Sequence, residues 1–416
     1  MSKNLITDFK ERGLIHQTTD ANSLHDWLAT PGRRIYAGFD PTADSLHVGH
    51  LVAIILLRRV ARAGHEPIAL IGGATGMIGD PSGRSEERNL LSHEALAANI
   101  AAVGNQIKGL LESTNQTIHI VNNVDWMRGV GYLEFLRDVG KHVPLSQMLA
   151  KDSVKSRLDR EGGLSYTEFS YMLLQSWDFV HLADEYDCCV QIGGSDQWGN
   201  ITAGIELGRR LRGFDLHGIT CPLLTKADGS KMGKTAKGAV WLSNEILSPY
   251  EYWQFWRNTA DGDVGRFLRL FTELSLEEII KLEALKDAEL NEAKKLLATE
   301  ATTLCHGKKA AINAANSAYQ TFEEGGIGNN LPETVLSIET LSMGVQLLDL
   351  LVGPTYGLQL AKSKGEARRL IRGGGIRIND QQVTDEARVV TNKDLNKERL
   401  IKLSAGKKRH ALVKQK

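Results

Sequence analysis

Short apolar runs alternate with longer amphipathic runs through the first half of the chain, and this alternation restricts the possible folds more than any other sequence feature. The short runs predict strands and the long runs predict helices. The predicted strands cover 34–37, 67–71, 117–121 and 187–192, and the predicted helices cover 47–62, 93–112 and 197–210. Strands that alternate with helices form a parallel sheet with helices on both faces. We therefore expect a Rossmann-like, doubly wound α/β domain.

The loops at one edge of this predicted sheet are where a ligand should bind. In a doubly wound sheet the binding crevice lies outside the carboxyl ends of the strands. The chemistry is therefore expected after Ala37, Ile71 and Ile192. The glycine-rich segment 71–83 follows one of these strands, but its glycines lack the GxGxxG spacing of a dinucleotide-binding loop. Tight packing explains these glycines better.

The remaining sequence predicts further segments. The pattern becomes helical from residue 248, and the glycine-rich stretch 323–332 begins a predicted linker. The expected organisation is a Rossmann-like domain over 1–247, an α-helical domain over 248–322, a linker over 323–354 and a small α+β domain over 355–416. Within the last domain, we expect a helix over 363–372, which glycines end, and a strand over 376–378.

Net charge is distributed unevenly along the chain. The 50 Lys and Arg residues balance the 50 Asp and Glu residues. Residues 355–416 alone contain 16 Lys and Arg against 6 Asp and Glu, a net charge of +10, so residues 1–354 carry −10. A folded basic module is typical of nucleic-acid binding, because contacts with phosphates release counterions. A solvated basic surface would give the same count. Our candidates for RNA contacts are Arg368, Arg369 and Arg372.

No segment of the sequence predicts a membrane span or secretion. The longest apolar run, 51–57, is far shorter than the ~20 residues that cross a bilayer, and the first residues lack the apolar stretch of a signal peptide. The four cysteines contain no CxxC pair, so we expect neither a zinc site nor a disulfide framework. These features predict a cytoplasmic protein.

A histidine pair follows the first predicted strand, in the sequence His47-Val48-Gly49-His50. Both histidines stand at the start of a predicted helix, whose free N–H groups and positive dipole end attract anions. The imidazoles could donate hydrogen bonds to charge that develops on a phosphate during a reaction. Taken alone, the pair is equally compatible with a polar surface or a weak metal site.

Two lysines flank a glycine much further along, in Lys231-Met232-Gly233-Lys234-Thr235. On a polar loop, the two ammonium groups could neutralise a triphosphate as its leaving group departs. A solvated basic loop is the commoner explanation for such a motif alone.

A third group of polar residues lies on the predicted helix 170–182. Tyr171, Gln175 and Asp178 stand at positions i, i+4 and i+7, so they share one face of an otherwise apolar helix. The exposed face of an amphipathic helix would show the same pattern. The pattern alone leaves both interpretations open.

Considered together, the two short motifs resemble the HIGH and KMSKS signatures of class I aminoacyl-tRNA synthetases. Val48 replaces the isoleucine, and Gly233 and Thr235 replace the two serines, while every His and Lys of the signatures is present. The segments 36–50, 71–83 and 191–200 resemble the bacterial tyrosyl-tRNA synthetase family, and the basic C-terminal module is similar to an S4 RNA-binding domain. The resemblance therefore covers essentially the whole chain.

The resemblance implies an enzyme that activates L-tyrosine with ATP and transfers tyrosine to the terminal adenosine of tRNA(Tyr). It also implies a homodimer, with 126–158 as the interface region, and Mg²⁺ that accompanies the triphosphate. The residues implied to stabilise the reacting charge are His47, His50, Lys231, Lys234 and Thr235. Two alternatives stay open, namely a tryptophan-specific relative and an RNA-binding protein of the same fold that has lost catalysis.

The resemblance also assigns the substrate contacts. Tyrosine would be bound by Tyr36, Asp80, Tyr171, Gln175, Asp178 and Gln191. In this set, Tyr171, Gln175 and Asp80 contact the ammonium group, and Tyr36 and Asp178 recognise the phenolic hydroxyl. ATP and the adenylate would be bound by Gly38, Asp40, Thr42, His47, Gly49, His50, Asp196, Gln197 and Lys234. Asp196 could also cap the predicted helix that follows it, and the two roles are compatible.

Overall fold

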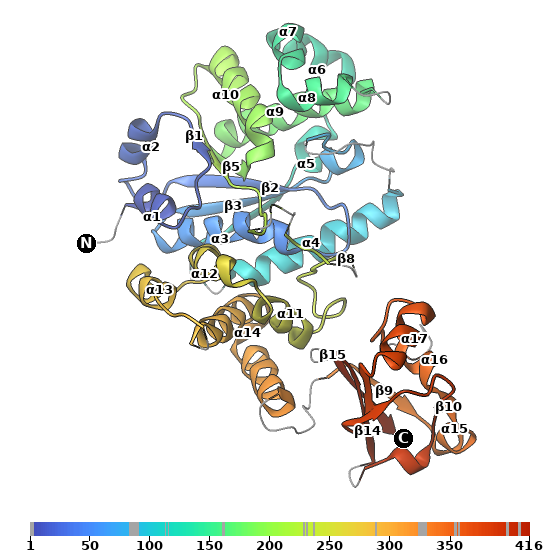
Figure 1. The fold of residues 1–416 in the computed structure, drawn as a ribbon. Helices are drawn as coiled ribbons and strands as arrows, with labels where there is room; N and C mark the ends of the chain where they lie inside the picture. Colours follow the sequence, from blue (N-terminus) through green and yellow to red (C-terminus); the bar gives the residue numbers. More distant parts are fainter. Residues whose placement is uncertain are drawn as a thin grey trace. The chain divides into compact units, whose positions relative to one another are not determined.

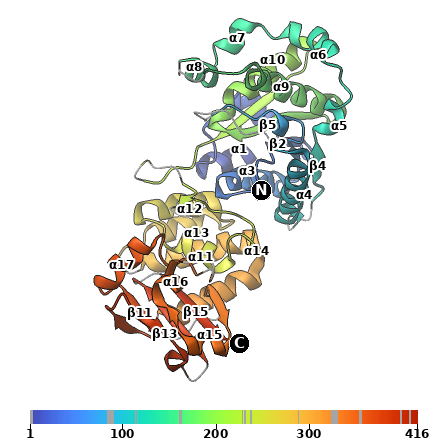
Figure 2. The same cartoon turned by 90° about the vertical axis from the view of Figure 1, so that its right-hand side faces the viewer.

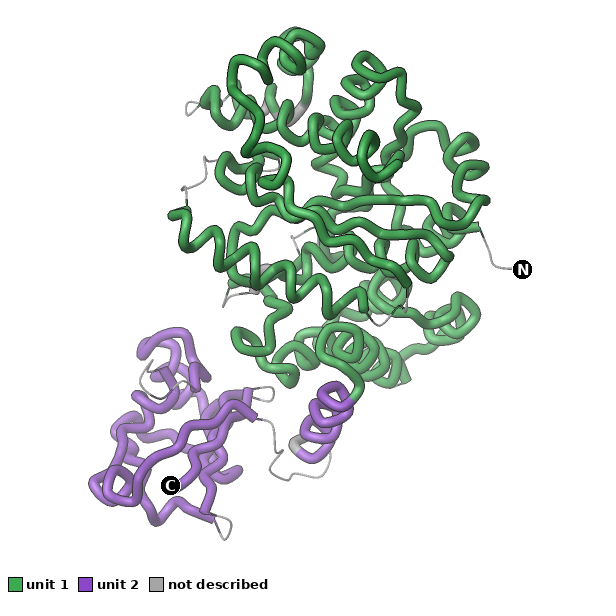
Figure 3. Tube along the Cα trace, turned by 180° about the vertical axis from the view of Figure 1, so that it is seen from behind, with its two compact units in different colours: residues 1–308 green, residues 309–416 purple. Residues whose placement is uncertain are grey.

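The fold is taken from a computed structural model of the chain, which divides into two compact units, 1–308 and 309–416 (Figure 3). The structure describes residues 4–82, 91–112, 114, 116–159, 163–227, 229, 232–235, 238–287, 289–322, 331–352, 356, 358–396, 399–406 and 409–416. Within these ranges, the side chains of 152, 153, 156, 234, 235, 321 and 322 are not described.

A six-stranded sheet forms the centre of the first unit, with the strand order β1-β6-β5-β2-β3-β4. The strands are β1 Gln17–Thr18, β2 Arg34–Phe39, β3 Glu66–Ile71, β4 His119–Asn122, β5 Cys188–Gly194 and β6 His217–Cys221. All neighbours pair in parallel except β1, which runs antiparallel to β6. Strands β3 and β4 follow β2 on one side of the sheet, and β5 and β6 then lie in sequence on the other side of β2. The predicted doubly wound α/β fold is confirmed, and the order reverses between β2 and β5.

Helices cover both faces of this sheet. Helices α3 (Val48–Arg62) and α4 (His93–Glu112) lie on one face, and α9 (Tyr166–Tyr186) and α10 (Trp198–Arg212) lie on the other (Figures 1 and 2). The strands are accordingly apolar on both sides, and every residue of β6 is buried. The smaller helices of this part are α1 Leu5–Glu11, α2 Ala21–Trp27, α5 Val124–Met127, α6 Tyr132–Asp138, α7 Leu145–Leu149 and α8 Asp152–Leu158.

The region after residue 248 is helical, as the sequence predicts. Its helices are α11 Pro249–Arg257, α12 Val264–Phe271, α13 Leu276–Glu283 and α14 Leu290–Phe322. Gly307 has a φ of 82° and a ψ of 159°, which are not helical angles, so α14 consists of two helices that meet there. Glycine adopts a positive φ at little steric cost, whereas other residues rarely do. The boundary between the two compact units falls immediately after this break.

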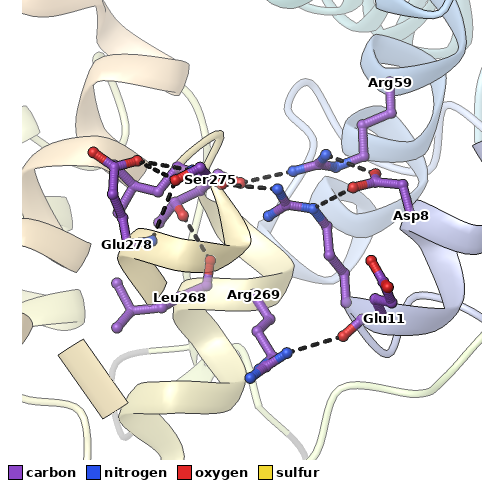
Figure 4. A network of polar contacts seen from close by, with 10 residues as sticks. Asp8, Glu11, Arg59, Leu268, Arg269, Ser275 and Glu278 are labelled. Carbon is purple, nitrogen blue, oxygen red and sulfur yellow. Dashed lines mark hydrogen bonds and ion pairs between the residues drawn. The ribbon is translucent and has the colours of Figure 1, made fainter. Parts of the chain in front are cut away.

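A charged network joins α1 and α3 to the turn that follows α12 (Figure 4). Asp8 accepts hydrogen bonds from Arg12 Nε and Arg59 Nη1, each at 2.9 Å. Arg59 also donates to the carbonyl of Thr272 at 2.9 Å, and Arg12 donates to the carbonyl of Leu274 at 2.8 Å. These carbonyls follow the last turn of α12, where backbone acceptors lack partners within the helix. The network therefore fixes the helical region to the helix that begins with the histidine pair.

The second unit contains a five-stranded sheet with the order β12-β11-β14-β15-β9. The strands are β9 Glu333–Leu336, β11 Ile376–Ile378, β12 Gln381–Val383, β14 Leu400–Ala405 and β15 Arg409–Gln415. Helix α17 (Lys364–Arg372) begins after Ser363, whose side chain accepts from the N–H of Glu366. The helix and strand expected over 363–378 are therefore present. Asn379 and Asp380, both with positive φ, form the turn between β11 and β12.

The structure differs from the linker expected over 323–354. Residues 323–330 lie outside the described ranges, but 331–352 contain β9, α15 (Ile338–Met343), β10 (Val345–Gln346) and α16 (Leu347–Val352). Strand β9 pairs in parallel with β15, and Leu341 and Leu350 are fully buried in the core of this unit. The expectation of a linker over 331–352 is wrong, because a strand that pairs with a distant segment carries no local signal of its partner.

We predict that removing the carboxylate of Asp8 will destabilise the first unit. Arg12 and Arg59 are only 5% and 12% exposed, so Asp8→Ala leaves two largely buried guanidinium groups without their carboxylate. The expected loss in the free energy of unfolding is about 3 kcal/mol. All seven tryptophans lie between residues 27 and 256, so a urea titration followed by tryptophan fluorescence reports on this unit alone.

The matched control is Asp26→Ala, since the side chain of Asp26 is 86% exposed and, among the described residues, forms an ion pair only with the neighbouring His25. Its effect should stay within about 0.5 kcal/mol. Equal midpoints for Asp8→Ala and Asp26→Ala would show that the network adds no stability.

Candidate active site

Two buried polar residues lie side by side where the strand order reverses. Tyr36 on β2 and Gln191 on β5 are register partners, so their side chains leave the same face of the sheet. Both residues are buried, and neither Tyr36 Oη nor Gln191 Oε1 has a hydrogen-bond partner among the described residues. Buried polar atoms are nearly always paired. Two such atoms on adjacent strands therefore mark a position suited to the polar groups of a ligand.

Asp178 is a buried carboxyl group that faces this position from α9. Asn123 Nδ2 donates to Asp178 Oδ2 at 3.0 Å, and Trp126 Nε1 donates to Oδ1 at 2.9 Å. Burial raises the pKa of Asp178 to about 7, although these two donors act in the opposite direction. Burial and the nearby charge of Asp178 also raise the pKa of Tyr36 well above its usual range. The predicted pair of Tyr36 and Asp178 is thus close together in a dry environment.

Sequence reasoning did not identify Asn123, although it lies at the carboxyl end of a strand. Its side chain also donates to Thr75 Oγ1 at 3.1 Å and accepts from the N–H of Ala74 at 2.7 Å. Asn123 therefore connects the glycine-rich loop after β3 to Asp178. Its position immediately after β4 was a usable signal, since the loops at that edge of the sheet are where ligands bind.

Tyr171 and Asp40 are in direct contact, although the resemblance assigns them to different parts of the substrate. Tyr171 Oη donates to Asp40 Oδ2 at 2.9 Å, and Thr75 Oγ1 donates to Asp40 Oδ1 at 2.8 Å. Burial, followed by the charge of Asp40, raises the pKa of Tyr171 well above its usual range. A Cβ atom at Gly72 would lie 2.1 Å from Asp40 Oδ1. Close packing therefore requires this glycine.

A chain of side-chain amides begins on α10 and ends at a carboxylate. Asn200 Nδ2 donates to Gln175 Oε1 at 2.8 Å, and Gln175 Nε2 donates to Gln197 Oε1 at 3.2 Å. Gln197 Nε2 then donates to Asp80 Oδ2 at 2.6 Å, while the backbone N–H of Ser82 donates to Asp80 Oδ1 at 2.9 Å. The structure therefore brings together Asp80 and Gln175, which the resemblance assigns to the ammonium group, and Gln197, which it assigns to the adenylate, and adds Asn200.

The histidine pair caps the start of α3. His47 Nδ1 accepts from the N–H of Gly49 at 3.0 Å, and His50 Nδ1 accepts from the N–H of His47 at 3.2 Å. The two rings stack with their centroids 4.0 Å apart. Because Nδ1 accepts in both rings, a neutral imidazole carries its proton on Nε2. The capping bonds therefore fix both the ring orientation and the tautomer that makes Nε2 a donor.

The second motif lies against the first. Strands β7 (Lys234–Thr235) and β8 (Gly238–Ala239) form a hairpin, and the N–H of Val48 donates to the carbonyl of Val240 at 2.9 Å. Gly233 has a φ of 86°, and a Cβ there would lie 2.9 Å from Val48 Cγ1. Glycine at this position therefore suits both the backbone angle and the close approach. Lys231 lies outside the described residues, as do the side chains of Lys234 and Thr235.

The remaining predicted residues lie at the same edge of the sheet. Gly38 is exposed near the end of β2, where a Cβ atom would meet no described atom within 4 Å, and Thr42 and Gly49 are also exposed. Asp196 lies in the short 3-10 turn Ser195–Gln197 that follows β5. Helix α10 has Gln197 at its N-cap and no side-chain capping bond, so the alternative role of Asp196 as a helix cap is not supported.

The fold and the two adjacent motifs define a class I aminoacyl-tRNA synthetase. Residues 30–323 match the family of class I tRNA synthetases for W and Y, and residues 327–413 match the SYY-like C-terminal domain of tyrosine–tRNA ligases. The chain therefore belongs to the tyrosine–tRNA ligase family, and it is an aminoacyl-tRNA ligase. The predicted family and class of enzyme are confirmed.

Relatives of known name match the chain over nearly its full length. The tyrosine–tRNA ligase of Mesorhizobium japonicum is 50% identical over 414 residues, which are 99% of this chain and 98% of that protein. The enzyme of the same name from Zymomonas mobilis is 52% identical over 405 residues, or 97% and 96% of the two chains.

Solved structures agree with this family. A C-terminally truncated mitochondrial tyrosyl-tRNA synthetase from Aspergillus nidulans is 34% identical, with a TM-score of 0.71, and the match covers 77% of this chain and 94% of that one. A tyrosyl-tRNA synthetase from Archaeoglobus fulgidus, complexed with L-tyrosine, has a TM-score of 0.56 at 16% identity and covers 75% and 99%. At that identity, the second match supports the fold alone.

Neither a metal cluster nor a membrane span is present in the described part of the chain. The described residues contain no group of three or more His, Cys, Asp or Glu side chains that could hold a metal ion. Among the same residues, no helix has the length and apolar character to cross a membrane.

The raised pKa of Asp178 predicts a pH-dependent stability. The ordinary value is 3.8 and the folded value is about 7, so the folded protein binds this proton more tightly than the unfolded chain does. The free energy of unfolding should therefore fall as the pH rises from about 4 to about 7. Relative to Asp178→Asn, the wild-type protein should lose about 2 kcal/mol between pH 5 and pH 8. Urea titrations at both pH values measure this difference.

The matched control for this prediction is Asp125→Asn, which changes a carboxyl group on the neighbouring helix α5, where no residue is buried. Its stability should follow the pH dependence of the wild-type protein. Parallel profiles for wild type and Asp178→Asn would mean that Asp178 does not hold its proton near neutral pH.

Proposed function

We propose that this chain activates L-tyrosine with ATP and then transfers tyrosine to tRNA(Tyr). The observation that carries the proposal is the convergence of three buried groups, Tyr36, Gln191 and Asp178, beside the point where the strand order reverses. A phenolic hydroxyl would supply a partner for Tyr36 Oη and Gln191 Oε1, whereas a plain phenyl ring would leave these two atoms unpaired at a cost of about 1 to 3 kcal/mol each. The site thus favours tyrosine over phenylalanine.

The activation step requires positioning and charge stabilisation. The tyrosine carboxylate attacks the α-phosphorus of ATP, the bond to the β-phosphate oxygen breaks, and pyrophosphate leaves. His47 and His50 are oriented by their capping bonds so that Nε2–H can donate to the phosphates at the helix N-terminus. Lys231, Lys234 and Thr235 belong to the motif that packs on the start of this helix, and their role is to stabilise the departing pyrophosphate. Mg²⁺ enters with the triphosphate as part of the substrate.

The adenylate is then used in the second step. A ribose hydroxyl of the terminal adenosine of tRNA attacks the activated carbonyl, and AMP leaves. The residues that we assign to the ribose and adenylate lie at the carboxyl edge of β2 and β5. They are Gly38, Asp40, Thr42, Gly49, Asp196 and Gln197. The exposure of Gly38 and Gly49 supports this assignment, because glycine allows a flat group to approach the backbone.

We also propose that the protein acts as a homodimer through the region 126–158. Tyr132, Leu133, Leu145 and Leu158 are exposed there, and Leu133 is 78% exposed. They lie on the successive short helices α6, α7 and α8, and exposed apolar patches are typical of protein interfaces. Val139, which lies in the same region, is buried within the unit, so it belongs to the core and not to the proposed interface. Sedimentation equilibrium would test the dimer.

A cytoplasmic location stays a prediction.

For the second unit we propose contact with tRNA through α17. Arg368 and Arg372 both pair with Glu386, whereas Arg369 is exposed and has no ion pair with a described residue. An arginine already engaged by a carboxylate must lose that contact before it binds a phosphate. Among the three predicted arginines, Arg369 is therefore the best candidate for a direct RNA contact.

Amino-acid-dependent exchange of pyrophosphate into ATP tests the proposed activity. Tyrosine should support exchange, and tryptophan and phenylalanine should not. Lys234→Ala should slow exchange by about a hundredfold, since a transition-state contact is lost, while the Kd for tyrosine stays unchanged. Lys226→Ala removes an exposed lysine from the same loop outside the motif and is the control.

The possible failures of this experiment differ from one another. Exchange with tryptophan alone would favour the tryptophan-specific relative, and no exchange with any amino acid would favour the RNA-binding protein without catalysis. A selective loss of tyrosine affinity in Lys234→Ala would contradict the role assigned to that lysine.

Charging assays over a range of salt concentrations test the RNA contact. Arg369→Ala should raise the KM for tRNA several-fold and reduce the slope of log KM against log salt by about one, without changing pyrophosphate exchange. Lys364→Ala, on the same helix but paired with Asp349, should change the slope less. An unchanged slope in Arg369→Ala would exclude that arginine from the phosphate contacts.

A further inference from the structure

The chain of amides between α9 and α10 has a direction that one carboxylate determines. A carboxylate accepts hydrogen bonds, so Asp80 Oδ2 requires the NH₂ group of Gln197 at 2.6 Å. Gln197 then presents its oxygen to Gln175, which must donate with Nε2 at 3.2 Å. Gln175 in turn presents Oε1 to the Nδ2 group of Asn200 at 2.8 Å. Reversing any one amide would place two donors or two acceptors against each other.

Asn200 is the donor that completes this chain. It is buried, and its Nδ2 group also lies 3.3 Å from Gln197 Oε1 and 3.4 Å from Ser82 Oγ. It belongs to the segment 191–200, in which the resemblance assigns roles only to Gln191, Asp196 and Gln197. The side chain of Asn200 contacts Gln175, Gln197 and Ser82 among the described residues. We therefore expect it to act on the substrate through Gln175 and Gln197.

We infer that Asn200 is a positioning residue for recognition of the amino-acid ammonium group. This inference rests on the proposed function, in which Gln175 accepts a hydrogen bond from that group. An ammonium group donates hydrogen bonds and accepts none, so it requires the oxygen of Gln175 and is repelled by the NH₂ group. With Asn200 in place, Gln175 Oε1 is held on the side of α10 and keeps a second lone pair. Without this donor, the amide of Gln175 is held only through Nε2, by Gln197 Oε1 at 3.2 Å, and Oε1 loses the contact that fixes its position.

The inference predicts a loss that depends on the amino group of the ligand. In Asn200→Ala and in the nearly isosteric Asn200→Asp, the Kd for L-tyrosine should rise about tenfold, the effect of one buried hydrogen bond. The Kd for 3-(4-hydroxyphenyl)propanoate, which is tyrosine without its amino group, should change less than about twofold. Titration calorimetry with the full chain measures both constants.

Two further variants separate positioning from general structure. Adding Asn200→Ala to Gln175→Ala should cause no further loss of tyrosine affinity, because Asn200 acts through Gln175. Thr202→Ala removes a hydroxyl group from the same helix, where it contacts Lys151 and not the amide chain, and should leave both affinities unchanged. Asn200→Asp preserves the side-chain volume if Asn200→Ala does not fold.

Equal losses for both ligands would overturn the inference, since they indicate a structural role only. Unchanged tyrosine affinity in both Asn200 variants would overturn it as well. If the wild-type protein bound the two ligands equally well, the assignment of Gln175 to the ammonium group would itself be wrong. Failure of the proposed function would appear separately, as pyrophosphate exchange that tyrosine does not support.

Discussion

The parallel pairing of β2 with β5 is the constraint on which the site depends. These strands are far apart in the sequence, and the chain builds the sheet outward from them in opposite directions. At such a reversal, the connections leave toward opposite faces and open a crevice at the carboxyl ends. Tyr36 and Gln191 meet there as register partners, and Asp40 and Asp196 follow the ends of the same two strands. A shift of one residue in this register would turn one of the two side chains to the other face.

Burial of Asp178 is costly, and the structure reduces that cost with two donors, Asn123 and Trp126. The donors do not fully compensate, because the pKa is still raised to about 7. A carboxyl group in this state can accept a hydrogen bond from a phenolic hydroxyl, since each of its oxygens retains a lone pair. In the proposed function, selectivity for a hydroxyl group arises from polar atoms that the folded chain leaves incompletely satisfied, and the raised pKa of Asp178 lowers stability at neutral pH.

Local patterns are sufficient to predict most of the sheet and its helices. The bounds of α4 match the expected helix, and β11 matches the expected strand, because periodicity and glycine stops are properties of the neighbouring residues. Contacts between distant segments cannot be obtained in this way. The sequence around Asn123 does not indicate that it lies against Asp178, and the sequence of β9 does not indicate that it pairs with β15.

The candidate site shows the same difference between local patterns and distant contacts. Resemblance assigns residues to the substrates because they stand in recognisable motifs, but it does not reveal that Tyr171 touches Asp40. Such relations join side chains from different strands and helices, so they require coordinates.

The charge of the C-terminal segment illustrates why composition needs the structure for its interpretation. Four of its six acidic residues form ion pairs with basic residues of the same segment, namely Glu366 with Arg409, Asp380 with Lys402, Asp394 with Arg388, and Glu386 with both Arg368 and Arg372. At long range the net charge of +10 still attracts a polyanion, because pairing does not change the sum. At contact distance, however, a guanidinium group that is already paired with a carboxylate must exchange that carboxylate for a phosphate, so the gain in binding free energy is small. The attraction and the binding contacts are therefore carried by different residues, and an exposed arginine such as Arg369, without an ion pair in the described part of the segment, can serve both.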